Sequence, residues 1–266
     1  MNITRRGMML LAGASLMAGA VFSAASAQTV EQIKSQGAVK IGMLVDFPPF
    51  GIMNESNQPD GYDADVAKLL AKELGVPVTI VPVTGPNRIP YLLSGQVDIL
   101  VASLGITPER AEKVAFSEPY AGIKISVYGL QDVDMATPEK LSGKKIGVAR
   151  ASTQDVAVTK IAPKDATIQR FDDDASAVQA LLSGQVEGLG VSNVVIAQIE
   201  QAAPGRFNEK FPLQQQVQGI ALKPGSTELL AFVNTFLKKV KADGELGKIH
   251  EKWLQSPLPD FVGATK

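Results

Sequence analysis

The sequence has no cysteine and only one histidine, His250. The absence of cysteine excludes disulfides, thiolate zinc sites, thiol nucleophiles and the lipid-modified cysteine that anchors bacterial lipoproteins. A histidine-ligated metal centre or a Ser-His-Asp triad would have to be built around that single imidazole. An excess of charge is lacking too, since 26 basic residues stand against 27 acidic ones, with a formal net charge of -1. Without a basic excess to neutralise phosphates, the composition argues against a nucleic-acid partner.

The first residues are typical of an export signal. Arg5 and Arg6 precede an apolar run over residues 8–22, and residues 25–27 form an Ala-Ser-Ala cleavage pattern. A transmembrane anchor needs about 20 apolar residues and has no such cleavage site. We therefore predict a cleavable signal peptide over residues 1–27 and a periplasmic protein. The arginine pair fits both the twin-arginine route and the general route.

Strand and helix patterns alternate along the rest of the chain, whose 266 residues suffice for one large domain or two small ones. Apolar residues spaced near 3.6 predict a helix over 63–74, which Asp63 or Asp65 can cap, and a shorter helix over 87–93. β-Branched apolar runs predict strands over residues 39–45, 78–83 and 97–102. This alternation predicts an α/β fold with mainly parallel sheets covered by helices.

One six-residue segment occurs twice, as LLSGQV at 92–97 and again at 181–186. In both places a helix pattern ends at Ser-Gly, and an acidic residue, Asp98 or Glu187, opens the strand that follows. Such turns are common in α/β proteins, so a chance match is the alternative interpretation. Two lobes of one architecture are favoured because matching strands lie upstream of both copies, at 40–43 and 145–148.

Two similar open sheets leave a cleft between them, and ligands of such sheets sit beyond the carboxyl ends of the strands. Ser103 and Ser192 close equivalent strands, so we expect both to face one cleft. The candidate site segments are those that directly follow strand patterns: 46–50, 84–88, 103–110, 150–153 and 192–193.

Short motifs follow one another along nearly the whole mature chain: DFPPF at 46–50, GYDAD at 61–65, IP at 89–90, SGQVD at 94–98, TPER at 107–110, FSEPY at 116–120, LSGKKIGV at 141–148 and KIHEKW at 248–253. Each motif is weak by itself. In this order and spacing they resemble the periplasmic solute-binding proteins of ATP-binding-cassette importers, family 3, in the polar amino acid branch.

The resemblance implies a two-lobed periplasmic-binding-protein fold of type II. Each lobe would be an open, mainly parallel sheet flanked by helices, with the cleft between the lobes. Lobe 1 would comprise residues 28–120 and 220–266, and lobe 2 residues 121–219, with hinge strands near 121–125 and 216–220. Binding would close the two lobes around the solute.

The resemblance also implies a function: a monomer without cofactor, metal or catalytic residue binds an amino acid or another small carboxylate. It would deliver this ligand to the membrane permease of an ATP-binding-cassette importer. One alternative is a periplasmic enzyme similar to cyclohexadienyl dehydratases, which needs a positioned general acid in the cleft. Another is a sensory binding protein that presents its ligand to a receptor.

Two arginines are the first candidates for ligand binding. Thr107 is expected to cap a helix that begins at Pro108, which places Arg110 in the first turn. Arg88 lies in a first turn after Asn87 in the same way. A cation there opposes the helix dipole, and a guanidinium matches a carboxylate with two parallel donors. The resemblance assigns the ligand carboxylate to Arg110 and an acidic ligand side chain to Arg88; solvated or salt-bridged surface arginines are the alternatives.

Other candidates carry two interpretations each. The resemblance implies that Phe47 packs on the ligand, although the residue could equally belong to the core. Asp46 could take an ammonium group or shape the turn. Ser152 and Thr153 could bind an anion at a helix N-terminus or serve as a plain cap.

The chain departs from the family pattern at the contacts for a ligand ammonium group. Gly105 stands where serine or threonine is usual, and Ser192, followed by Asn193, stands where an aspartate is usual. Ser103, Ser192 or Asn193 would then supply neutral acceptors. Two cations facing one pocket with few anionic contacts favour aspartate, glutamate or a related acid over lysine or arginine.

The acidic run 172–174 and the single histidine are given structural interpretations. The run precedes an apolar-periodic helix over 175–182, so we interpret it as a helix cap and solvated charge rather than a metal site. His250 is expected to be exposed, because Ile249 and Trp253 face the core from the same helix.

Overall fold

The computed structural model describes residues 27–263. Its main sheet has eight strands in the order β4-β1-β5-β10-β6-β9-β7-β8. These strands are β1 (Val39–Leu44), β4 (Val78–Val83), β5 (Ile99–Leu100), β6 (Ala115–Leu130), β7 (Lys145–Ala149), β8 (Thr167–Phe171), β9 (Gly188–Ser192) and β10 (Phe207–Leu222). A short hairpin of β2 (Ile52–Met53) and β3 (Pro59–Asp60) lies apart from this sheet.

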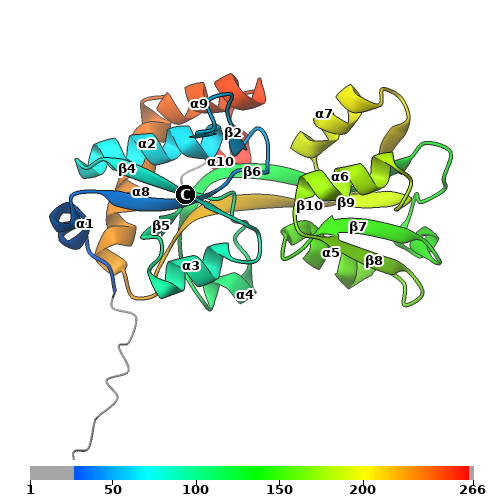
Figure 1. Cartoon of the computed structure of the whole chain (residues 1–266), viewed down its shortest axis with the longest axis horizontal. Helices are drawn as coiled ribbons and strands as arrows, with labels where there is room; N and C mark the ends of the chain where they lie inside the picture. Colours follow the sequence, from blue (N-terminus) through cyan, green and yellow to red (C-terminus); the bar gives the residue numbers. More distant parts are fainter. Residues whose placement is uncertain (1–26, 264–266) are drawn as a thin grey trace, which may run out of the picture.

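Two lobes lie side by side, each built on three parallel strands (Figure 1). In lobe 1, β1 pairs with β4 and β5; in lobe 2, β7 pairs with β8 and β9. Lobe 1 carries α1 (Val30–Gln36), α2 (Tyr62–Leu74), α3 (Arg88–Ser94), α4 (Pro108–Ala111), α8 (Thr227–Ala242), α9 (Glu245–Leu254) and α10 (Asp260–Gly263). Lobe 2 carries α5 (Thr153–Ile161), α6 (Asp174–Leu182) and α7 (Asn193–Ala202), and a 3₁₀ turn (Pro138–Leu141) precedes β7. The predicted two-lobed α/β fold is confirmed.

Two long antiparallel strands, β6 and β10, pass from one lobe into the other (Figure 1). Each has 16 residues, and their register places Gln216 opposite Ile123 and Val217 opposite Gly122. β6 continues beside β9 in lobe 2, while β10 contacts β5 in lobe 1. These strands are the covalent connections between the lobes, so a rotation of one lobe against the other must bend them.

The internal repeat corresponds to one hydrogen-bonding arrangement used in both lobes. The Asp98 carboxylate accepts from the backbone N–H of Lys40 at 2.8 Å, and the Glu187 carboxylate accepts from that of Lys145 at 2.7 Å. In both lobes an acidic residue thus ties the start of the third parallel strand to the first strand. The repeated sequence therefore marks repeated structure.

Two local expectations were wrong. Neither Asp63 nor Asp65 caps α2; the N-cap is Gly61, at a φ of 125°, and Asp63 turns inward and is fully buried. His250 is also buried, with 3% of its surface exposed, and its Nδ1 donates to the backbone oxygen of Ser256 at 2.6 Å. Because burial disfavours the imidazolium, the pKa of His250 is lowered.

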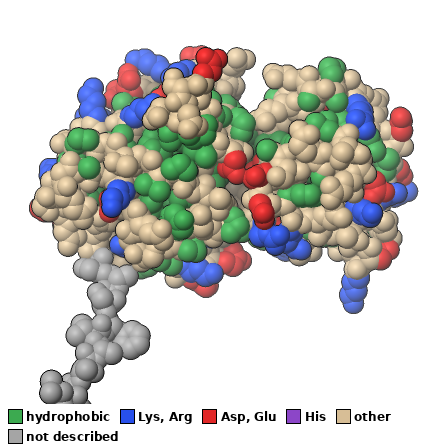
Figure 2. Space-filling view, in the orientation of Figure 1, with side chains coloured by type: hydrophobic (Ala, Val, Ile, Leu, Met, Phe, Trp, Pro, Cys, Tyr) green, Lys and Arg blue, Asp and Glu red, His purple; other side chains and the backbone are tan. Residues whose placement is uncertain are grey.

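The surface is notched between the lobes, and acidic side chains gather at this notch (Figure 2). Over residues 27–263, no helix combines the length and the apolar character that crossing a membrane requires. The predicted signal peptide covers residues 1–27, and residues 1–26 lie outside the described part of the chain.

Candidate ligand-binding cleft

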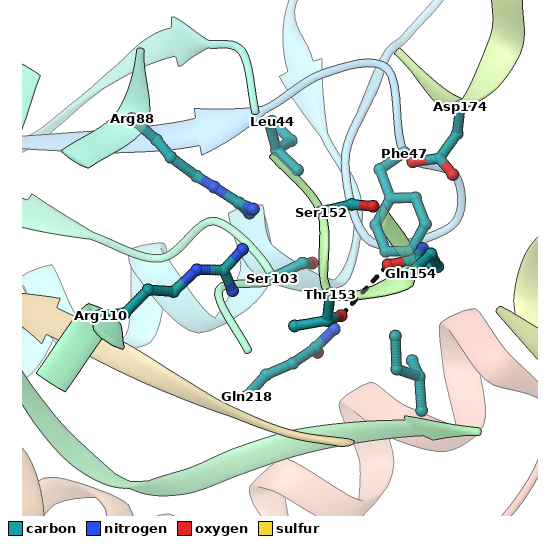
Figure 3. Close-up of a pocket in the computed structure, with 11 residues that line it drawn as sticks. Leu44, Phe47, Arg88, Ser103, Arg110, Ser152, Thr153, Gln154, Asp174 and Gln218 are labelled. Carbon is teal, nitrogen blue, oxygen red and sulfur yellow. Dashed lines mark hydrogen bonds between the residues drawn. The ribbon is translucent and has the colours of Figure 1, made fainter. Parts of the chain in front are cut away.

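A cavity of about 30 Å³ lies between the lobes, lined from both sides and from the connecting strands. Its lining comprises Leu44, Phe47, Arg88, Ser103, Arg110, Ile123, Ser152, Thr153, Gln154, Asp174 and Gln218 (Figure 3). A volume of this size holds water but no amino acid. An amino acid needs more room than the cavity offers in this arrangement of the lobes.

Arg110 connects the two lobes. The Thr107 hydroxyl accepts from the backbone N–H of Arg110, and Pro108 is the first residue of α4, as the sequence predicted. The guanidinium donates through Nη1 to the Gly105 oxygen and through Nη2 to the Ala151 oxygen, both at 2.8 Å. Burial lowers the pKa of Arg110 to about 10, because a charged group is poorly solvated there.

Arg88 lies deeper, with 5% of its surface exposed. It begins α3, and its Nη1 donates to the backbone oxygen of Ala102 at 2.9 Å. Burial, and secondarily the positive charge of Arg110, lower the pKa of Arg88 to about 9. Neither arginine has a salt bridge to a carboxylate within residues 27–263. Two cations in one closed cleft are costly unless an anion joins them.

Apolar and hydroxyl side chains shape the rest of the lobe 1 wall. Phe47 is 4% exposed and stacks on Phe50 at 5.5 Å between ring centroids, so it belongs to the core and lines the cavity at once. Ser103 also lines the cavity, but its hydroxyl donates to Oδ2 of the buried Asp63 at 2.7 Å. The Ser103 hydroxyl is thereby held in place by lobe 1 itself.

Lobe 2 contributes the first turn of α5. Ser152 is the N-cap of this helix, and its hydroxyl accepts from the backbone N–H of Asp155 at 3.0 Å. Thr153 donates from its hydroxyl to the Gln154 side-chain oxygen at 3.1 Å. All three residues from Ser152 to Gln154 line the cavity (Figure 3). Ser152 is thus the helix cap and part of the cavity wall at once.

Four predicted site residues are absent from the cavity lining. Ser192 ends β9 but is fully buried, and its hydroxyl finds no partner in residues 27–263. Asn193 accepts from the backbone N–H of Lys124 at 2.9 Å and faces a separate groove. Gly105 contributes its backbone oxygen to Arg110 rather than a cavity wall. Asp46 lies beside the cavity in an adjoining pocket.

Five residues that the sequence did not single out line the cavity: the apolar Leu44 and Ile123, and the polar Gln154, Asp174 and Gln218. The interpretation of the acidic run as cap and solvated charge holds for Asp173, which caps α6 through Ser176, and for the exposed Asp172. It was wrong for Asp174, which faces the cavity (Figure 3). The sequence signal that could have found Asp174 is its position in the first turn of a helix. The same signal singled out the two arginines.

This arrangement of two guanidinium groups between two lobes is suited to enclosing a small solute that bears a carboxylate. Residues 39–256 match the model of the bacterial extracellular solute-binding proteins, family 3, and the chain belongs to that family. It is 31% identical over 232 residues to the glutamine-binding protein of an ABC transporter of Bacillus subtilis, with 85% of each chain covered. It is 26% identical over 258 residues to the L-cystine-binding protein of Escherichia coli, covering 95% of this chain and 96% of the relative.

Solved structures give the same result. The solute receptor for L-cysteine of Neisseria gonorrhoeae superposes with a TM-score of 0.80 at 31% identity, covering 85% of this chain and 94% of that one. An ancestral arginine-binding protein bound to arginine gives 0.77 at 35% identity, covering 82% and 98%. An ancestral amino acid-binding protein described as a precursor of cyclohexadienyl dehydratase gives 0.78 at 34% identity, covering 84% and 98%.

Proposed function

We propose that this protein captures an amino acid between its lobes and delivers it to the membrane permease of an ABC importer. Two arginines that line one interlobe cavity, the buried Arg88 and the half-buried Arg110, carry the proposal. Relatives named for binding glutamine, cystine and arginine support the ligand class. We propose further that the protein acts as a monomer in the periplasm after removal of its signal peptide.

The ligand is proposed to bind by hinge closure. In this proposal residues 28–120 and 220–266 move as lobe 1 and residues 121–219 as lobe 2, with bending near 121–125 and 216–220. Support comes from β6 and β10, which run through both lobes at these positions. The small cavity volume supports it as well, because an amino acid needs the lobes apart to enter.

We propose that the ligand is acidic or strongly polar. Arg110 is assigned the ligand α-carboxylate and Arg88 its side chain, because two guanidinium groups that have no carboxylate partner within residues 27–263 lie in one cavity wall (Figure 3). A ligand that brings one carboxylate leaves one of the two cations unbalanced, whereas aspartate or glutamate supplies an anion for each. Phe47 covers the ligand, and the turn of Ser152 and Thr153 closes on it from lobe 2.

The test is a thermal-shift screen of amino acids and keto acids, followed by competition of L-glutamate against L-arginine. A ligand present at 100 times its Kd adds about 2.7 kcal/mol to the free energy of unfolding. Glutamate should bind the wild type more tightly than arginine does, and Arg88→Ala should reduce or reverse this difference in affinity. The matched control is Arg150→Ala, since Arg150 is an exposed arginine in a surface ion pair with Asp172. The assignment of Arg88 would be contradicted if arginine bound the wild type more tightly than glutamate. It would also be contradicted if Arg88→Ala left the difference in affinity unchanged.

A dehydratase is the second candidate function, and one observation favours it. Asp174 faces the cavity, and burial, together with the nearby Asp46, raises the pKa of Asp174 to about 7, a value suited to a general acid. A solved relative is described as a precursor of cyclohexadienyl dehydratase. Incubation with a cyclohexadienyl acid, followed by ultraviolet absorbance of an aromatic product, separates the enzyme from the carrier. Product formation that Asp174→Asn abolishes would establish the enzyme.

A further inference from the structure

The cavity has an anionic end as well as a cationic one. Asp174, the first residue of α6, is the one carboxylate among the described residues that line it. In Figure 3 its side chain lies beyond Phe47, across the cavity from the two guanidinium groups. We infer that Asp174 binds the ammonium group of the ligand while Arg88 and Arg110 hold its carboxylate groups. This inference rests on the proposed function, in which the ligand is an amino acid.

Negative charges outnumber positive charges around Asp174. It has no salt bridge within the described residues, and the charged groups that act on it are Asp46 from lobe 1, Arg88 from α3 and Asp173 at the cap of α6. Two of these three neighbours are themselves carboxylates. Asp46 and Asp174 also share a pocket of about 140 Å³ that adjoins the cavity. A half-buried carboxylate beside other carboxylates is destabilised until a cation joins it.

A second, independent observation points to a ligand that brings hydrogen-bond donors. Gln218, on β10, is 1% exposed and lines the cavity, and its side-chain oxygen has no hydrogen-bond partner within residues 27–263. A buried acceptor left unsatisfied is destabilising, because it has lost its hydrogen bonds to water and gained none in return. The hydroxyls of Ser103 and Thr153 already donate to other side chains. A ligand N–H is a donor that could satisfy this oxygen.

The formal charges favour a particular class of amino acid. Arg88 and Arg110 contribute two positive charges to the cavity, and an ionised Asp174 contributes one negative charge. An amino acid with two carboxylates and one ammonium group carries one net negative charge, so the closed complex is neutral. A neutral zwitterion leaves one excess positive charge in a buried site, which is costly. The anionic end thus supports an acidic amino acid rather than a plain dicarboxylate.

Binding of a ligand ammonium group should also release a proton from Asp174. With a pKa of about 7 in the empty cleft, Asp174 is about half protonated at pH 7. A ligand cation favours the carboxylate and lowers this pKa, so binding at pH 7 releases up to about half a proton. Asp46 faces the same pocket from lobe 1, and burial raises its pKa too. Asp173 and Arg88, the other charged neighbours, keep the same charge in the Asp174→Asn variant.

The experiment compares L-glutamate with glutarate, which has the two carboxylates but no amino group. Calorimetric titration of the wild type, Asp174→Asn and the control Asp172→Asn is run at pH 7 in buffers of different ionisation enthalpy. Asp172 is the matched control because it lies two residues away and its side chain is 89% exposed. We expect the wild type and the control to prefer glutamate by about tenfold or more and to release protons. In Asp174→Asn the preference should fall to about threefold or less, without proton release.

An Asp174→Asn variant that keeps both the preference and the proton release overturns the inference. If wild-type protein binds neither probe, the same ratio is measured with L-glutamine and its analogue without the amino group. If the ratio of the Kd values for this second pair changes in Asp174→Asn, the inference is supported, although the proposed preference for an acidic ligand has failed. If the ratio is the same in Asp174→Asn as in the wild type, the inference is overturned. Circular dichroism and the melting temperature of each variant show that the fold is retained. The two proposals are therefore tested separately.

Discussion

The hydroxyl of Ser103, which lines the cavity, donates a 2.7 Å hydrogen bond to Oδ2 of the fully buried Asp63. Oδ1 of the same carboxylate accepts from the Tyr120 hydroxyl at 2.7 Å, and that hydroxyl accepts from the backbone N–H of Ser103 at 3.1 Å. This ring of hydrogen bonds holds Ser103 at a φ of 47°, in the left-handed region. It also fixes the preceding residue, Ala102, whose carbonyl positions Arg88.

We expect Asp63→Ala to lower the free energy of unfolding by about 2–5 kcal/mol. The variant leaves two buried hydroxyl donors without an acceptor and opens a small void, and each loss is costly in a desolvated site. Urea denaturation measures the effect. Asp60→Ala is the control, because Asp60 forms a surface ion pair with Lys68 at 3.5 Å and should cost less than about 1 kcal/mol. Equal losses in the two variants would contradict a buried structural role for Asp63.

Asp63 should also make stability depend on pH. Burial raises the pKa of Asp63 from its ordinary value of 3.8 to about 7. Between about pH 4 and 7 the folded protein keeps a proton that the unfolded chain has released, so stability falls as pH rises, by up to about 1.4 kcal/mol per pH unit. Asp63→Asn removes this titration. Unfolding measured from pH 4 to 8 should therefore give a shallower fall than in the wild type, and identical slopes would contradict the prediction.

Arg110→Ala should weaken ligand binding by about 2–5 kcal/mol, which is roughly 30- to several-thousand-fold in Kd. The change removes a charge-assisted pair in a desolvated cleft and the hydrogen bond to Ala151 of lobe 2. Arg110→Lys should recover little, because an ammonium group cannot reproduce the planar fork of donors. Calorimetric titration checks both variants. A Kd of Arg110→Ala within threefold of the wild-type value would exclude Arg110 as the residue that holds the ligand carboxylate.

Gly105→Ala should hinder closure of the lobes. A Cβ at this position would lie 2.8 Å from Cγ2 of Thr153 in lobe 2 and 2.9 Å from Cγ of Gln216. Overpacking of this kind costs about 1–3 kcal/mol, or roughly 5- to 150-fold in Kd. The control is Gly247→Ala in α9, where a Cβ meets nothing within 4 Å and alanine should add up to about 1 kcal/mol of stability. Small-angle scattering with ligand should show Gly105→Ala more open than the control.

Gln198→Ala should shift the lobes toward the open state. Nε2 of Gln198, on α7, donates across the cleft to the Pro48 oxygen at 2.8 Å. Losing this bond removes about 0.5–1.5 kcal/mol from the closed state, which weakens binding by roughly 2- to 12-fold. Gln201→Ala, an exposed glutamine on the same helix, is the control and should leave Kd unchanged. A loss of unfolding stability without a change in Kd would contradict this role.

The sequence determined the elements and the repeated architecture. Apolar periodicity and turn residues are local signals, so β1, β4, α2 and α3 lie within a residue or two of their predicted bounds. The duplicated segment predicted two similar lobes, and Asp98 and Glu187 make equivalent bonds in them. The cap by Thr107 and the first-turn positions of Arg88 and Arg110 also followed from local rules.

Only the tertiary structure decided which polar side chains meet. Whether a first-turn carboxylate is solvated or buried depends on what distant segments of the chain place opposite it, and no local pattern carries that information. From the sequence, Asp174 was therefore interpreted as a solvated charge and Asp63 as a helix cap. Ser192 ends its strand as expected but lies beneath the surface, while Gln218 faces the cavity because both lobes are joined through its strand. Contacts between lobes arise from chain segments far apart in sequence, and packing in three dimensions alone sets them.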